Sequence, residues 1–277
     1  MKKNKLVVPI DFTPVSHEAL LYACELAVNN DLEIVAVHVL DTKVIEEFSQ
    51  HEDAELRETA KQMQQDMEKK TRADLDNFLD GLSVFYGDII EPLVAHGTIY
   101  DAFNTVAREN NGSLVIMGTH GIVGMQHVFG SKAYKVVAGS GYPFLVVQAR
   151  SYNTINKVYL VLKNKAMLEA YADDLLNFAK FFKGEFLVCY LDNSSDGLLP
   201  AALNDLAHRF SFGTANFQAQ DIVLSASKAG ADVIGFGIDE SENDVNTVYG
   251  LSQDRILVNN LKLPVLCLPD LSKKKAV

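Results

Sequence analysis

Short apolar runs alternate with segments of helical periodicity through the first 150 residues of the chain. Short, largely apolar runs of this length are typical of strands buried in a parallel sheet. The runs occupy residues 6–10, 32–40, 91–96, 114–117 and 144–148. The helical stripes between them occupy residues 16–29, 46–82, 99–109 and 131–138. This alternation predicts parallel strands joined by right-handed helical crossovers, which is the pattern of an open α/β domain.

Two of the helical segments carry more specific signals. Thr13 is a good N-cap residue and Pro14 is a good first helical residue, so a helix should begin at this point. The segment 46–82 is highly charged between its apolar positions. We therefore expect a long amphipathic helix on the surface, broken once.

The same pattern then repeats in the second half of the chain. Lys157–Leu162 (KVYLVL) resembles Lys5–Ile10 (KLVVPI), and Pro264–Leu268 (PVLCL) resembles Pro143–Val147 (PFLVV). Between them we expect strands at 185–191, 216–218 and 233–237, and helical segments at 166–182, 200–210, 221–229 and 249–260. Two copies of one α/β unit, joined near residues 150–155, are the predicted organisation. Edge-to-edge pairing of the strands that contain Val147 and Leu266 would cover two exposed edges.

A loop spaced by glycines follows the fourth apolar run. It contains Gly118, Gly121, Gly124 and Gly130, and Ser131 then opens the next helical segment. Glycines let a backbone approach a ligand closely, and the free N–H groups and dipole of a helix start favour an anion. Nucleotide binding is therefore the first hypothesis. The spacing is neither G-x-G-x-x-G nor G-x-x-x-x-G-K-[ST], which excludes the usual dinucleotide and P-loop sites.

Charge and composition exclude several classes of function. The 277 residues carry a formal net charge of −11, which argues against non-specific nucleic-acid binding because phosphate contacts need a basic surface. Cys24, Cys189 and Cys267 are far apart and lie in apolar runs, so we expect buried thiols and neither a disulfide nor a metal site. No signal peptide and no apolar run near the length of a membrane span is recognisable, and we expect a cytoplasmic protein.

Other polar residues are best explained by structural roles. His38 lies within a predicted strand, and we expect it to be packed there. Asp192–Gly197 begins like a calcium loop, but Leu203 stands where the closing Glu is required, so we expect a turn. No metal site is predicted, and no catalytic residue is predicted because no partnered nucleophile is visible by spacing.

Four features of the first half occur together: Pro9-Ile10-Asp11, Val37-His38-Val39, Gly97, and the glycine loop after Leu114–Gly118. In these residues the chain resembles the universal stress protein family, in its tandem two-domain form. The nucleotide-binding signature of the family is G-x-x-G, nine residues and G-[ST]. Gly118–Gly121 and Gly130-Ser131 supply its two parts here, with the eight residues 122–129 between them. The motifs cover residues 1–149, and residues 155–270 are similar by architecture alone.

This resemblance implies an α/β fold with two tandem domains, residues 1–150 and 151–277. Each would have an open five-stranded parallel sheet of order 3-2-1-4-5, as in adenine-nucleotide alpha-hydrolase-like folds. An adenine nucleotide such as ATP or AMP, with or without Mg²⁺, would bind at the carboxyl ends of strands one and four. The implied nucleotide-binding residues are Pro9, Asp11, Val39, Met117, Gly118, His120, Gly121, Gly130, Ser131 and Lys132. Asp11 and Val39 would face adenine, and Ser131 and Lys132 would hold the distal phosphates.

The second copy lacks these features. Lys163 stands where Asp11 stands in the first copy, and the glycine loop is replaced by an acidic segment with carboxylates at Asp239, Glu240, Glu242 and Asp244. Carboxylates close to a phosphate are unfavourable because like charges repel. We therefore expect the second domain to be a structural partner of the first, in an internal pseudo-dimer that could pair again as a homodimer.

These observations together favour a stress-response regulator that binds an adenine nucleotide in its first domain and acts on an unidentified protein partner. Neither a nucleic acid nor a membrane is an expected partner. Two alternatives stay open: a nucleotide-free interaction scaffold whose glycine loop is vestigial, and a weak ATPase in which Ser131 would be required for turnover.

Overall fold

A computed structural model of the chain describes residues 4–109, 114–119, 141–148, 152–192, 197–214, 219–237 and 263–269. Ten strands form one continuous sheet in the order β3-β2-β1-β4-β5-β10-β9-β6-β7-β8. All neighbouring strands are parallel except β5 and β10. The sheet therefore consists of two five-stranded halves that run in opposite directions and meet at its centre.

The first half follows the predicted alternation of strands and helices. Its strands are β1 (Lys5–Pro9), β2 (Glu33–Leu40), β3 (Ile90–His96), β4 (Leu114–Thr119) and β5 (Phe144–Gln148). Its described helices are α1 (Pro14–Asn30), α2 (Lys43–Ser49), α3 (Ala54–Tyr86), the 3-10 turn η1 (Gly87–Ile89) and α4 (Ile99–Glu109). The strand order 3-2-1-4-5 is the predicted one. The expected helix at 131–138 lies outside the described residues.

Local sequence signals explain where the first helices begin. The Thr13 hydroxyl accepts a hydrogen bond from the Ser16 N–H, and Pro14 is the first residue of α1, as predicted. The charged segment 46–82 forms two helices, and the carboxylate of Asp53 caps α3 by accepting from the Glu55 N–H. The expected single break in this segment is therefore confirmed at residues 50–53.

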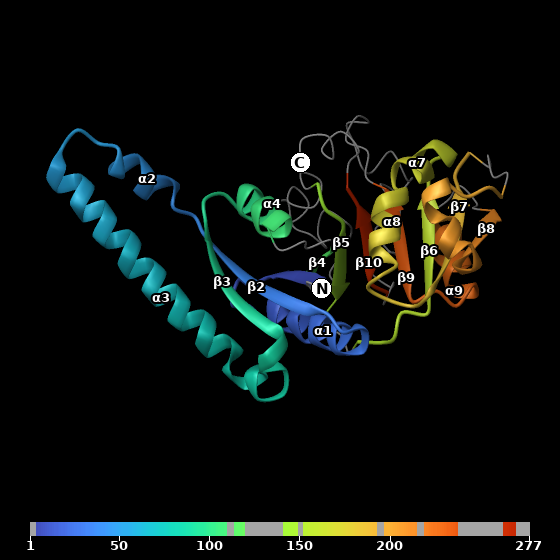
Figure 1. Ribbon diagram of the computed structural model, residues 1–277, viewed down its shortest axis with the longest axis horizontal. Helices are drawn as coiled ribbons and strands as arrows, with labels where there is room; N and C mark the ends of the chain where they lie inside the picture. Colours follow the sequence, from blue (N-terminus) through green and yellow to red (C-terminus); the bar gives the residue numbers. More distant parts are fainter. Residues whose placement is uncertain are drawn as a thin grey trace.

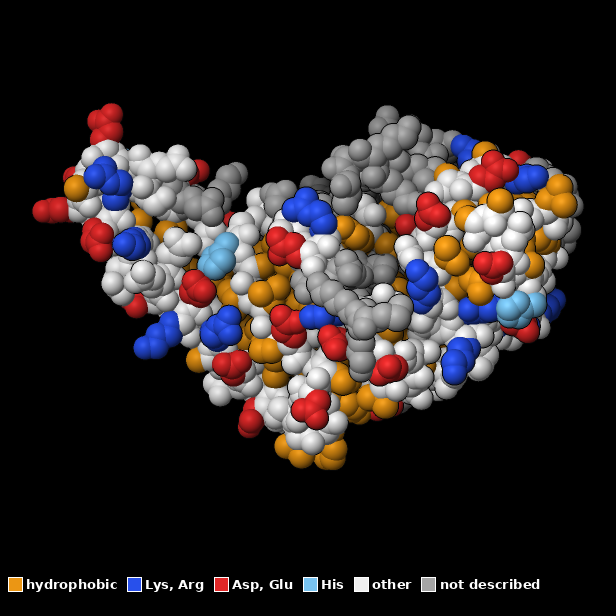
Figure 2. All heavy atoms as spheres, in the orientation of Figure 1, with side chains coloured by type: hydrophobic (Ala, Val, Ile, Leu, Met, Phe, Trp, Pro, Cys, Tyr) orange, Lys and Arg blue, Asp and Glu red, His pale blue; other side chains and the backbone are white. Residues whose placement is uncertain are grey.

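Helix α3 is partly packed and partly projecting. Leu75, Leu79 and Leu82 are buried against the sheet and α1. The beginning of α3 and helix α2 extend away from the sheet as an arm (Figure 1). Charged side chains of both signs cover this arm in the space-filling view (Figure 2). The arm is thus the solvated part of a helix whose other end is anchored in the core.

The second half repeats the same strand order. Its strands are β6 (Lys157–Leu162), β7 (Glu185–Tyr190), β8 (Phe210–Thr214), β9 (Val233–Gly237) and β10 (Val265–Leu268). Its described helices are α7 (Lys165–Ala170), α8 (Ala172–Phe178), the 3-10 helix η2 (Ala201–Arg209) and α9 (Ala219–Lys228). The expected helix at 249–260 lies outside the described residues.

Two elements of the second half differ from the sequence predictions. The third strand is Phe210–Thr214, whereas the expected strand at 216–218 lies outside the described residues. Phe210 stacks on Phe186 with ring centroids 4.6 Å apart, so core packing selects the earlier segment. The expected helix 166–182 forms two short helices and ends at Phe178, because the N–H groups of Lys180 and Phe181 bond only three residues back.

The two halves are joined by the pairing of their edge strands and by a common hydrophobic core. Strand β10 pairs with β5 in antiparallel register, with Leu266 opposite Leu145 and Cys267 opposite Phe144. This confirms the predicted pairing of the strands that contain Val147 and Leu266. On one face of the sheet, residues of α1, α3, α7 and α8 form a single hydrophobic cluster. Pairing and packing therefore join the two halves into one sheet with no free edge at its centre.

Candidate functional site

Strand β1 is the point at which the strand order of the first half reverses: β2 and β3 lie on one side of it, and β4 and β5 lie on the other. This strand lies between β2 and β4, with Val7 opposite both Val35 and Val115. Helix α1 packs on the face that holds the large shared cluster, whereas Val106 and Ala107 of α4 pack on the other face. The connections β1–α1–β2 and β3–α4–β4 therefore cross opposite faces of the sheet, and a crevice is expected at the carboxyl ends of β1 and β4, where the strand order reverses. Of the predicted site residues, Pro9, Met117 and Gly118 lie at the ends of β1 and β4, Val39 lies at the end of β2, and Asp11 follows β1.

Asp11 is the first charged residue beyond β1, and a short hydrogen-bonded loop holds it. Its Oδ1 accepts from the Thr13 hydroxyl at 2.6 Å and from the Thr13 N–H at 3.1 Å. The main-chain N–H of Asp11 in turn donates to the Ser16 hydroxyl at 3.4 Å. The side chain is exposed, and a carboxylate has more acceptor positions than these two hydrogen bonds use. Asp11 thus both braces the start of α1 and presents a carboxylate oxygen at the crevice.

The environment of Asp11 favours its ionised form. Partial burial opposes ionisation and by itself raises the pKa, but the hydrogen bonds from Thr13 and Ser16 outweigh it. The pKa of Asp11 therefore lies below its ordinary value. The group is a permanent hydrogen-bond acceptor near neutral pH, which suits recognition of an amino or hydroxyl group.

Phe12 has a backbone conformation that is unusual for a residue with a side chain. Its φ is +62°, in the left-handed region. Its ring stacks on His38 of β2, with centroids 4.5 Å apart, and meets Phe78 of α3 edge-on at 5.8 Å. His38 also donates from Nδ1 to the Ile10 carbonyl oxygen at 2.7 Å. As expected, His38 is a packed strand residue, and its contacts hold the β1–α1 loop in place.

Three of the predicted contacts share one face of the sheet. Val39 and Met117 are partly buried beside the cluster that includes Val7. Pro9 follows Val7 by two positions and so lies on the same face. Because β1 runs between β2 and β4, these residues form an apolar floor next to Asp11. A flat apolar ring could lie on this floor with its polar edge near the carboxylate.

Gly118 lies where β4 passes the start of α1. A Cβ atom at this position would lie 2.4 Å from the Val15 carbonyl oxygen, which is too close for any side chain. The glycine is therefore required for helix–sheet packing whether or not a ligand binds. The other predicted contacts, His120, Gly121, Gly130, Ser131 and Lys132, lie outside the described residues.

The equivalent crevice in the second half is built differently. Tyr159 lies opposite Ile234 as Val7 lies opposite Val115, so the register makes Lys163 the counterpart of Asp11 and Gly237 the counterpart of Gly118. A Cβ on Gly237 would meet the fully buried ring of Tyr171 at 2.6 Å. A large aromatic side chain therefore packs where the first half has Val15. The acidic residues 239–244 lie outside the described residues.

Reactive cysteine chemistry and metal ligation are not supported at this site. All three cysteines are free and buried, as predicted. Burial raises the pKa of the Cys24 and Cys267 thiols to about 12, so both stay protonated. Within the described ranges, no group of three or more His, Cys, Asp or Glu side chains could hold a metal ion. Nor is any helix in those ranges both long and apolar enough to cross a bilayer.

The sequence pointed to Asp11, Pro9, Val39 and Met117 as candidate site residues but not to the residues that pack around Asp11. Phe12 and Phe78 gave no signal, because a left-handed φ and a contact between distant residues are not visible in a local pattern. The pair Thr13 and Ser16 could have been found, since a serine three residues after an N-cap can bond back to it.

Comparisons with known proteins agree with this geometry. Residues 3–148 match the model of the universal stress protein family. A universal stress protein of Methanocaldococcus jannaschii is 26% identical over 158 residues, which are 52% of this chain and 82% of that protein. The crystal structure of a universal stress protein from Archaeoglobus fulgidus has a TM-score of 0.55 at 15% identity, and the match covers 96% of each chain. The fold similarity thus spans both halves, whereas the family model covers the first.

Proposed function

The chain belongs to the universal stress protein family, and on that premise we propose that its first half binds an adenine nucleotide and that the protein is a regulator of the stress response. The observation that carries this proposal is the pairing of a carboxylate with an apolar floor at the strand reversal. Asp11 can accept from the adenine amine or a ribose hydroxyl, while Pro9, Val39 and Met117 contact the ring. Crevices at such reversals are the usual ligand sites of open α/β sheets.

The proposed ligand is defined better at its adenosine end than at its phosphates. Gly130, Ser131 and Lys132 would hold the distal phosphates, and Mg²⁺ would screen their charge. Residues 122–129 contain neither Lys nor Arg, and the chain has a net charge of −11. Both features weaken the attraction for a triphosphate, so AMP is as good a candidate as ATP.

We further propose that the two halves are separate domains, residues 1–150 and 151–277, with different roles. Lys163 in place of Asp11 and the buried Tyr171 ring beside Gly237 argue against nucleotide binding in the second. Its role would be structural, through the pairing of β5 with β10. Nucleotide binding in the first domain would change a surface that a protein partner in the cytoplasm recognises.

Calorimetry with ATP, ADP and AMP, each with and without Mg²⁺, tests this function. We expect sub-millimolar binding of at least one nucleotide to the full chain. Asp11→Asn should weaken that binding about tenfold, which corresponds to about 1.4 kcal/mol. Asp88→Asn, at an exposed position outside the crevice, should leave it unchanged.

Ser131→Ala separates the remaining possibilities. If the phosphates lie at Ser131, this variant should bind ATP more weakly and AMP as well as the wild type does. Absence of binding of all three nucleotides would overturn the proposal in favour of a ligand-free scaffold. Steady release of inorganic phosphate from ATP that Ser131→Ala abolishes would instead indicate a weak ATPase.

A further inference from the structure

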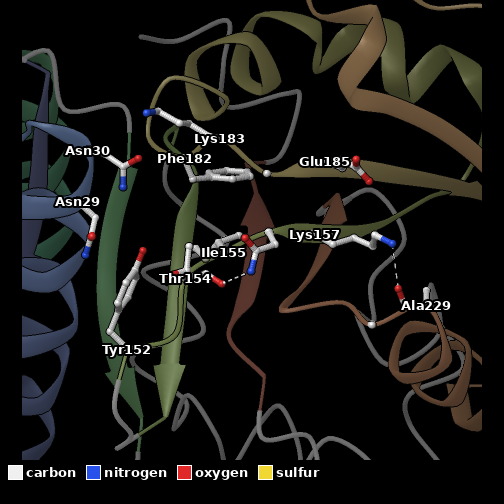
Figure 3. A pocket seen from close by; sticks show the side chains of 13 residues that line it. Asn29, Asn30, Tyr152, Thr154, Ile155, Lys157, Phe182, Lys183, Glu185 and Ala229 are labelled. Atoms are coloured by element: carbon white, nitrogen blue, oxygen red, sulfur yellow. Dashed lines mark hydrogen bonds between the residues drawn. The ribbon is translucent and has the colours of Figure 1, made fainter.

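A cavity of about 640 Å³ lies where the connector between the two halves passes the end of α1. Asn29, Asn30 and Tyr152 line one side of it, and Lys157 and Glu185 line the other (Figure 3). Its volume is in the range of small-molecule sites, roughly 300–1,000 Å³. None of its lining residues belongs to β1, β4 or the β1–α1 loop. It is therefore distinct from the nucleotide crevice.

The walls of the cavity are held by specific contacts. The Asp232 carboxylate accepts from the main-chain N–H groups of Asn156 at 2.8 Å and Lys157 at 3.0 Å. Arg209 donates to the carbonyl oxygens of Phe182 and Gly184 on the neighbouring segment. Contacts of this kind keep a site in shape before a ligand arrives, which lowers the entropic cost of binding.

Several polar groups on these walls have no partner within the described part of the chain. Lys183 and Glu185 form no ion pair, and in Figure 3 their charged ends lie at opposite sides of the Phe182 ring. The side-chain N–H groups of Asn29 and Asn30 donate back to carbonyl oxygens of α1. Their amide oxygens are therefore the atoms left to accept from a ligand.

Two helix ends add negative potential to the same cavity. The C-terminal residues of α1 and the Ala229-Gly230 turn that follows α9 both line it. Lys157 already places its ammonium group on the Ala229 carbonyl oxygen, 3.1 Å away. A helix C-terminus favours a cation, and this contact is an internal example. The cavity thus offers acceptors for an ammonium group and, at Lys183, a separate cation for a carboxylate.

We propose that this cavity binds a small zwitterion that carries both an ammonium group and a carboxylate, such as a free amino acid. The ammonium group bonds to Glu185, and the carboxylate pairs with Lys183. A ligand that carried only a positive or only a negative charge would pair with one of these two side chains and leave the other close to a like charge. The half-buried Tyr152 ring, held edge-on by Tyr22 at 5.1 Å, contacts the ligand's side chain.

Calorimetry of the full chain against each of the standard amino acids, one at a time, tests this site. We expect at least one to bind with a Kd of about 1 mM or tighter. Two analogues of that amino acid, one without its carboxylate and one without its ammonium group, should each bind at least about tenfold more weakly. Lys183→Ala and Glu185→Gln should each produce a loss of the same size.

Matched controls decide whether the loss is local. Lys180→Ala lies on the same segment but outside the cavity lining, and Glu169→Gln is an exposed position on α7, so neither should change binding. Asp11→Asn should also bind the zwitterion normally, which separates this site from the nucleotide crevice. The proposal is wrong if no amino acid binds at about 10 mM, if a single-pole analogue binds equally well, or if the Lys183 and Glu185 variants bind like the wild type.

Discussion

The hydroxyl group of Tyr171 donates a hydrogen bond to the carbonyl oxygen of Pro269, 2.8 Å away, at the carboxyl end of the second half of the sheet. The ring of Tyr171 also packs against Gly237, and the side chain is fully buried. In the first half, a smaller residue, Val15, packs against Gly118 with its main chain and its Cγ1 atom. One tyrosine therefore gives the two halves different interiors at equivalent positions.

Replacing Tyr171 should measure this packing. Tyr171→Phe removes one buried hydrogen bond and should lower the free energy of unfolding by about 1–2 kcal/mol. Tyr171→Ala also leaves a large cavity and should cost about 3–5 kcal/mol. Urea denaturation followed by circular dichroism gives both values. A cost for Tyr171→Ala no larger than that for Tyr171→Phe would show that the ring is not tightly packed.

Arg209 ties the end of η2 to the segment 179–184, and within the described residues it has no carboxylate partner. Its guanidinium group donates to the carbonyl oxygens of Ala179, Phe182 and Gly184 and lies over the Phe182 ring. A lysine carries its donors on one nitrogen and cannot reach all three acceptors. Arg209→Lys should therefore cost about 1–3 kcal/mol in urea denaturation. Arg72→Lys on the exposed face of α3 is the matched control and should stay within about 0.5 kcal/mol.

Replacement of two glycines by alanine should change the stability of the protein in opposite directions. Gly118→Ala places a Cβ 2.4 Å from the Val15 carbonyl oxygen and should destabilise the protein by about 1–3 kcal/mol. Gly81 lies inside α3 with open space around it, so Gly81→Ala should stabilise by about 0.5–1 kcal/mol. Thermal unfolding of the two variants beside the wild type tests the pair. Equal effects would contradict the packing described for Gly118.

The ionisation of Asp11 should make a small part of the stability depend on pH. Because its folded-state pKa lies below the ordinary value of 3.8, the ionised group stabilises the native state above that pH. This contribution is lost as the pH falls through the folded-state pKa. The stability difference between wild type and Asp11→Asn should therefore be constant near neutral pH and shrink below about pH 4. Urea denaturation across this pH range measures the stability difference. A difference that grows on acidification would contradict a lowered pKa for Asp11.

The three cysteines should be inert in the native protein. Each is at most 4% exposed, and burial raises the pKa of Cys24 and Cys267 to about 12. Since the thiolate is the reactive form, a thiol reagent at pH 8 should label none of them until the chain is unfolded in urea. Ser83→Cys, at an exposed position on α3, provides the positive control. Rapid labelling of the wild-type native protein would show that the centre of the sheet opens readily.

Most of the regular structure in the described residues could be predicted from local patterns. The strands β5, β6 and β9 and the helix α4 have the expected ends, and Thr13 caps α1. These predictions succeed because strand burial, helix periodicity and capping depend on residues that are close together in sequence. The third strand of the second half was expected a few residues too far along the chain. The alternation of Phe210 and Phe212 with small residues was a usable signal for its actual position.

By itself, the sequence determined the order of elements, the repeat and the resemblance of the first half to the universal stress protein family, and it led to the prediction that Asp11 binds a ligand. Only the tertiary structure decided what depends on contacts between distant residues. These are the strain and stacking of Phe12, the collision that requires Gly118, the burial of Tyr171, and the cavity that joins the end of α1 to Lys183 and Glu185. The physical reason is that propensity and periodicity act over a few residues, whereas packing and charge pairing act wherever the fold brings side chains together.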